Sequence, residues 1–130
     1  MTDRLRAMPD GDDERDFVEF SHPGGHLVAR VAVPSIGQGE APTVRDQIAG
    51  RIAGIDRGRC FVLDLSQVSL ISSLGLGTCV DLRNTAEKAG LRPVAFGLNR
   101  HLVDLFRLMR IDRLYEMPKS QQELDALLSR

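Results

Sequence analysis

The chain has 130 residues, of which 42% are apolar and 27% charged, so it can fold as one domain around its own hydrophobic core. Its 17 basic and 18 acidic side chains give a formal net charge of −1, which argues against the basic surface of a nucleic-acid binder. The presence of only two cysteines excludes a disulfide-rich secreted scaffold. A membrane-spanning helix needs about 20 consecutive apolar residues, and no apolar run approaches that length. These counts predict a cytoplasmic protein that neither binds nucleic acid nor inserts into a membrane.

The chain is expected to begin with a tail and then a hairpin. Residues 1–13 are polar and lack periodicity, which predicts a disordered tail ahead of one domain spanning 14–130. Residues 16–20 alternate polar and apolar side chains, as does a strand with one wet face. Turn-forming residues at 22–25 separate it from a second predicted strand at 26–33, so the two strands are expected to pair as a hairpin.

Helical spacing follows a loop expected at 34–40. Pro42 suits the first turn of a helix, where its missing N–H is not needed. Apolar residues then recur at intervals of three and four, as on the buried side of a helix. They are Val44, Ile48, Ile52 and Ile55. The continuous apolar run at 60–65 predicts a central strand that is buried on both faces.

A second helix is predicted from Ser73 to Lys88 or Ala89, with Gly90 as its C-terminal stop. Its buried stripe would include three residues at helical spacing. They are Cys79, Leu82 and Ala86. A further strand is predicted at 93–97.

Two more helices are expected in the last third of the chain. Asn99 is a good N-cap for a helix carrying Leu102, Val103, Leu105, Phe106 and Met109. A short edge strand is predicted at 114–117, and Ser120 and Glu123 have the spacing of a capping box before a helix with Leu124, Leu127 and Leu128. The order of these elements predicts a single α/β domain: a mixed, mainly parallel sheet of four to five strands covered by about four helices.

The most distinctive stretch is 70–77, where Ser72 and Ser73 stand at the start of the second helix with Gly75 and Gly77 in its first turn. A helix N-terminus exposes unpaired N–H groups and favours a phosphate or a phosphorylated side chain. Glycines there let another backbone or a partner approach closely. Two interpretations stay open: a serine that only caps a helix packed tightly on the sheet, or a corner that a partner binds.

Residues 61–77 resemble the signature of the STAS family, named for sulphate transporters and anti-sigma factor antagonists. In that family a strand ending in Asp-Leu-Ser, matched here by 64–66, precedes the run Asp-Ser-Ser/Thr-Gly-Leu-Gly at the start of a helix, matched by 72–77. The resemblance covers about the last two-thirds of the chain and implies a STAS-like domain. Small stand-alone members of the family are typically bacterial anti-sigma factor antagonists.

The resemblance implies a phosphorylation switch rather than an enzyme. Ser73 matches the serine that an anti-sigma factor with serine kinase activity phosphorylates in the family. The unphosphorylated antagonist binds the anti-sigma factor and frees the sigma factor, and the phosphorylated form dissociates, so transcription is regulated. The expected partner-binding residues are Ser72, Ser73, Leu74, Gly75 and Leu76.

The chain departs from the family pattern at three places. Ser72 stands where the family has Asp, and Leu74 where it has Ser or Thr. Upstream, residues 34–37 read Pro-Ser-Ile-Gly where the family usually has Gly-Glu-Leu-Asp. The alternative is therefore a STAS scaffold or regulatory subunit of a signalling or transporter assembly that is never phosphorylated.

The remaining polar residues suggest structural roles. Asp64 and Ser66 are expected to cap the loop after their strand. Three histidines without metal-ligand spacing are expected at the surface or in structural positions: His22, His26 and His101. Four late arginines are expected to form a solvated face, or to attract an acidic partner surface: Arg100, Arg107, Arg110 and Arg113. With no nucleophile–base pair, no catalytic residue, cofactor or metal is expected.

Overall fold

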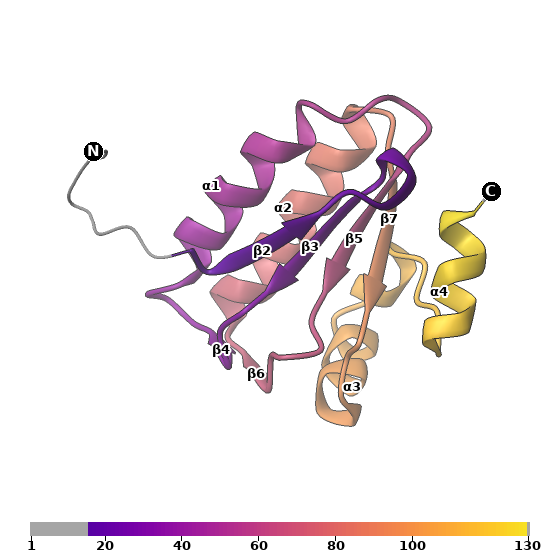
Figure 1. Cartoon of the computed structure of the whole chain (residues 1–130). Coiled ribbons are helices and arrows are strands. Elements are labelled where there is room, and N and C mark those ends of the chain that lie inside the picture. The colour runs from indigo at the N-terminus through magenta and orange to yellow at the C-terminus, as the bar shows by residue number, and fades with distance from the viewer. Residues whose placement is uncertain (1–15, 130) are drawn as a thin grey trace.

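A four-stranded sheet in the order β2-β3-β5-β7 organises the fold (Figure 1). The computed structural model describes residues 16–129, and the tail expected at 1–13 lies outside the described residues. The strands are β2 (Val18–Ser21), β3 (Leu27–Val31), β5 (Cys60–Asp64) and β7 (Arg92–Phe96). β2 and β3 pair antiparallel as the predicted hairpin, whereas β3–β5 and β5–β7 are parallel. The predicted mixed, mainly parallel sheet is confirmed.

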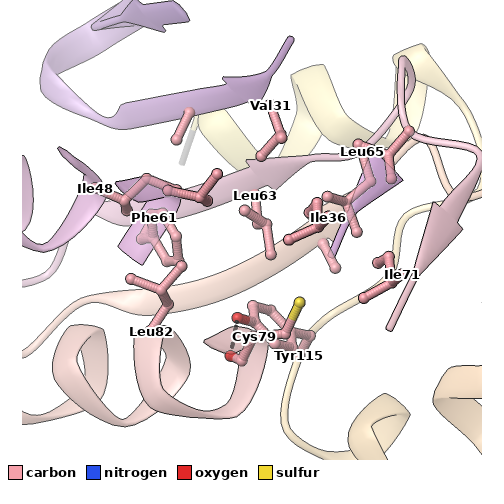
Figure 2. Packing of buried hydrophobic residues seen from close by; sticks show 14 of the residues in the cluster. Val31, Ile36, Ile48, Phe61, Leu63, Leu65, Ile71, Cys79, Leu82 and Tyr115 are labelled. Atoms are coloured by element: carbon pink, nitrogen blue, oxygen red, sulfur yellow. Dashed lines mark hydrogen bonds between the residues drawn. The ribbon is translucent and has the colours of Figure 1, made fainter. Parts of the chain in front are cut away.

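Alternation along β5 explains why its sequence is continuously apolar. Phe61 and Leu63 belong to the main core under α1 (Ala41–Ile52) and α2 (Ser73–Lys88). Cys60 and Val62 point to the opposite face and pack with Leu124 of α4 (Gln121–Leu128). Successive side chains of a strand face opposite sides of the sheet, so a strand covered on both sides must be apolar throughout. Figure 2 shows the main core, where Phe61 lies between Ile48 and Leu82.

Two short strands lie where the sequence predicted no strand. β4 (Ser35–Ile36) pairs in parallel with β6 (Leu70–Ile71), and the two form a separate sheet. The loop expectation at 34–40 is therefore wrong for Ser35 and Ile36. Each strand has two residues, too short for periodicity to reveal, and their pairing joins segments that are distant in the sequence.

The segment between β7 and α4 differs from the prediction in two details. α3 (Arg100–Leu108) ends before Met109, which was expected within the helix and is 56% exposed. A 3-10 turn, η2 (Ile111–Arg113), follows, and the edge strand expected at 114–117 is reduced to one bridge between Val94 and Glu116. In the first half of the chain, α1 also ends earlier than expected: its last residue is Ile52, so Ile55 lies beyond the helix.

The last helix is held by its cap and by a buried histidine. The Ser120 hydroxyl oxygen accepts the N–H of Glu123 at 3.1 Å, as the predicted capping box requires. The Glu123 carboxylate accepts the N–H of Lys119, whereas in a standard capping box it would accept the N–H of Ser120. His26 Nδ1 accepts the N–H of Cys60 at 2.9 Å. Its Nε2 therefore carries the proton and donates to the carbonyl of Leu128 at 2.8 Å, which ties α4 to the sheet.

No helix within residues 16–129 is long and apolar enough to cross a membrane.

Candidate functional site

The start of α2 is built around the capping serine, Ser72. Its backbone is extended (φ −77°, ψ 172°), and its hydroxyl oxygen accepts the N–H of Gly75 at 3.2 Å. The same hydroxyl donates to the carbonyl of Ile36 at 3.3 Å, and the Ser72 N–H donates to that carbonyl at 3.0 Å. Ser72 therefore fastens α2 to β4, and its hydroxyl both caps the helix and donates to that strand.

The next two residues face outward. Ser73 is exposed, and no hydrogen bond joins its hydroxyl to any residue from 16 to 129. Leu74 is 49% exposed, and Leu70, at the start of β6, is 57% exposed. The free Ser73 hydroxyl and the exposed Leu74 next to it in the chain form an accessible surface with both polar and apolar character.

The two glycines of the first turns have different surroundings. A Cβ on Gly75 would stand 2.5 Å from the carbonyl oxygen of Ile36 and 2.6 Å from a methyl carbon of Ile71, so only glycine fits there. A Cβ on Gly77 would meet no atom within 4 Å. Gly75 thus serves packing, as one of the two interpretations of this stretch proposes.

The five residues expected to bind a partner divide into two groups. Ser72, Ser73 and Leu74 lie at the surface, whereas Gly75 is buried and Leu76 is only 8% exposed. The exposed corner formed by Ser73 and Leu74 is hereafter called the serine corner. Gly75 and Leu76 support it from beneath.

A groove of about 220 Å³ runs beside the serine corner, between α1 and α2. Leu74, Gly77 and Asp81 line it from α2 at helical spacing, and Arg45 is among the residues that line it from α1. The spacing within α2 is a signal that the sequence analysis missed. The contribution of α1 had no local signal, because it depends on how the two helices pack.

The electrostatics of the corner favour an added negative charge. The first turn of α2 contains no acidic side chain, so no carboxylate there offsets the positive end of the helix dipole. Immediately before this turn, at the N-cap, Ser72 stands where the family pattern has Asp.

Asp64 closes the loop after β5, as the sequence predicted. Its carboxylate accepts the N–H of Ser66 at 2.9 Å and lies 3.6 Å from the guanidinium of Arg30. Only 8% of Asp64 is exposed, so it acts as a loop acceptor beneath the surface.

The other residues that the sequence singled out are structural, exposed or chemically inert. His26 has the structural role described above, while His22 and His101 are exposed. Burial raises the pKa of the Cys79 thiol to about 12, so it stays protonated and is not a nucleophile at neutral pH. Within residues 16–129, no group of three or more His, Cys, Asp or Glu side chains is placed to hold a metal ion.

The late arginines are exposed around α3 and η2. Arg100 forms an ion pair with Asp104 at 3.6 Å, four residues along the same helix. Arg107, Arg110 and Arg113 are exposed, which agrees with a solvated face.

Comparison with solved structures identifies the fold. A STAS-domain anti-sigma-factor antagonist protein from Planctomyces limnophilus has a TM-score of 0.78 at 13% identity, over 87% of this chain and 98% of that chain. The phosphorylated form of the Bacillus cell fate determinant SpoIIAA has a TM-score of 0.63 at 13% identity, over 84% of this chain and 97% of that chain. The STAS segment of the murine anion transporter Slc26a9 has a TM-score of 0.68 at 16% identity, over 81% of this chain and 18% of that chain. No protein-family model and no curated protein sequence matches.

The chain therefore has the STAS fold, as the resemblance at residues 61–77 implied. More particularly, it matches the small antagonist proteins over nearly their whole length, and the transporter over one segment. Because the identities are below 25%, these similarities define the fold alone.

Proposed function

We propose that this protein is an anti-sigma factor antagonist that binds an anti-sigma factor with serine kinase activity in the bacterial cytoplasm. Phosphorylation of Ser73 releases the complex and so regulates transcription. The observation that carries the proposal is the serine corner: an exposed Ser73 hydroxyl without a hydrogen-bond partner among residues 16–129, next to an exposed Leu74, on the first turn of α2.

The hydrogen bonds of the two serines favour Ser73 as the acceptor. Phosphorylation of Ser72 would break its bond to the Gly75 N–H or to the Ile36 carbonyl, because its hydroxyl serves both. Ser73 loses no such bond, and its phosphate would sit at the N-terminal end of α2, where the helix dipole and free N–H groups favour it. The modified protein would therefore stay folded.

The same phosphate would oppose partner binding. It adds about −1.5 to −2 charge at neutral pH to a surface that has to lose water in the complex. A penalty of about 3 kcal/mol would weaken the affinity roughly a hundredfold. The groove between α1 and α2 extends the proposed contact beyond the serine corner, with Leu74 at its edge and Gly77 leaving its floor open.

The test is a titration against anti-sigma factors from the same genome, each purified and measured by calorimetry. We expect one of them to bind stoichiometrically and, with Mg-ATP, to add one phosphate that mass spectrometry locates at Ser73. Ser73→Ala should bind and resist phosphorylation, and Ser73→Asp should bind more weakly. Ser72→Ala is the matched control, which should still be phosphorylated. If Ser73→Asp binds as tightly as the unmodified protein, the switch is refuted.

A second function is a STAS scaffold in a signalling or transporter assembly that is never phosphorylated. Ser72 at the N-cap of α2, where the family pattern has Asp, favours it. Mass spectrometry of the protein isolated from its native cells separates the two functions. Unmodified Ser73 under every growth condition supports the scaffold, and a phosphorylated fraction supports the antagonist.

A further inference from the structure

A cavity of about 530 Å³ lies at the carboxyl end of β7. Residues 95–98 at the end of that strand line it together with parts of α3 and the segment 115–120. Its volume falls within the range of small-molecule pockets, roughly 300–1,000 Å³. Sheets with parallel strands often bind ligands beyond the carboxyl ends of those strands. None of residues 72–76 lines the cavity, so it is separate from the serine corner.

Much of the cavity wall is apolar. Phe96, Val103, Tyr115 and Met117 all line it. The hydroxyl of Tyr115 donates to the carbonyl of Cys79 at 2.6 Å, so this residue offers the cavity its ring rather than a free donor. These side chains suit a ring or a short acyl chain, which would leave water on binding.

The charged side chains of the cavity are predominantly basic. Arg107 and Lys119 line it together with a single carboxylate, that of Asp112. Two further carboxylates lie near the cavity without lining it: Glu116 forms an ion pair with Arg92 at 2.6 Å, whereas Glu123 accepts the backbone N–H of Lys119 and keeps its negative charge. Within residues 16–129, no ion pair neutralises Arg107 or Lys119.

We propose that this cavity binds a small amphiphilic organic anion, with its apolar part against Phe96, Val103 and Tyr115 and its carboxylate or phosphate at Arg107 and Lys119. The apolar wall provides burial, and among the side chains that line the cavity two cations outnumber one carboxylate, which favours an anionic ligand. Such a site would add ligand binding to the protein binding proposed above.

The test is a pair of probes that share a ring and differ in charge, 2-naphthoate and 2-naphthylmethylammonium. Each is titrated into the full chain and followed by ¹H–¹⁵N NMR. We expect 2-naphthoate to give saturable shifts confined to residues lining the cavity, and to bind at least about tenfold more tightly than the ammonium probe, a difference of about 1.4 kcal/mol. Equal affinities, shifts elsewhere or no saturable shifts at millimolar concentration would overturn the proposal.

Variants distinguish the cavity from general surface charge. The double variant Arg107→Gln with Lys119→Gln should lower the 2-naphthoate affinity about tenfold. Arg100→Gln is the matched control, since it removes a charge from the same helix at a side chain that is 90% exposed and outside the cavity. If Arg100→Gln weakens binding as much as the double variant does, the proposal fails. Ser73→Ala should leave 2-naphthoate binding unchanged, so this test and that of the antagonist function can fail independently.

Discussion

Replacing Gly75 or Gly77 by alanine adds the same methyl group to α2 in two different surroundings. At Gly77 the new Cβ meets nothing within 4 Å, so the helix gains the preference of alanine over glycine, about 1 kcal/mol. At Gly75 the Cβ would stand 2.5 Å from the Ile36 carbonyl oxygen. Ordinary contact begins at 3.4 Å, so the Ile36 carbonyl would have to move. This carbonyl accepts hydrogen bonds from both the N–H and the hydroxyl of Ser72.

Overpacking of this kind typically costs about 1–3 kcal/mol. Because the 2.5 Å contact is with backbone, we expect a cost in the upper part of that range, above the helical gain of about 1 kcal/mol. We therefore expect Gly75→Ala to be less stable than the parent protein and Gly77→Ala to be more stable, by about 1 kcal/mol in the second case. Urea unfolding followed by circular dichroism measures both. The reasoning is refuted if Gly75→Ala matches the parent in stability, or if Gly77→Ala is the less stable of the two variants. Because its methyl group would enter the groove, Gly77→Ala should also weaken partner binding while the protein stays folded.

Three further predictions concern stability. Ser72→Ala should lower the free energy of unfolding by about 1 kcal/mol through loss of the cap, and Ser73→Ala should change it by less than about 0.5 kcal/mol, as urea unfolding will report. His26→Ala should cost about 2–4 kcal/mol and speed amide hydrogen exchange in α4, because it removes the hydrogen bonds of His26 to the Cys60 N–H and to the Leu128 carbonyl. The exposed His22→Ala should do neither. Cys79 has a folded pKa of about 12 against 9.0 for the free thiol, so the unfolded chain loses this proton first. The free energy of unfolding should therefore fall by about 1 kcal/mol between pH 8 and pH 10. In Cys79→Ala, urea unfolding at the same two pH values should show a smaller fall.

Elements with a strong local pattern could be predicted from the sequence. The hairpin, β5, α2 and the caps at Asn99 and Ser120 were confirmed, because each depends on side chains close together in the chain. The β4–β6 pair could not be predicted, since two-residue strands carry no period and their pairing joins distant segments. Met109 was misplaced because the helical spacing continues past the point where α3 ends.

The candidate site was predictable only in part. The family resemblance located the start of α2, but it did not show that Ser72 is committed as a cap while the Ser73 hydroxyl is unengaged, which depends on the distant carbonyl of Ile36. The groove beside Leu74 likewise depends on how α1 packs against α2.

The most direct test of the proposed switch compares one partner with two forms of the same protein. The chain is phosphorylated by its anti-sigma factor, the modified form is purified, and calorimetry measures the Kd of each form without nucleotide turnover. A Kd that rises roughly a hundredfold on phosphorylation of Ser73 is the predicted result. An unchanged Kd for protein fully phosphorylated at Ser73 would contradict it.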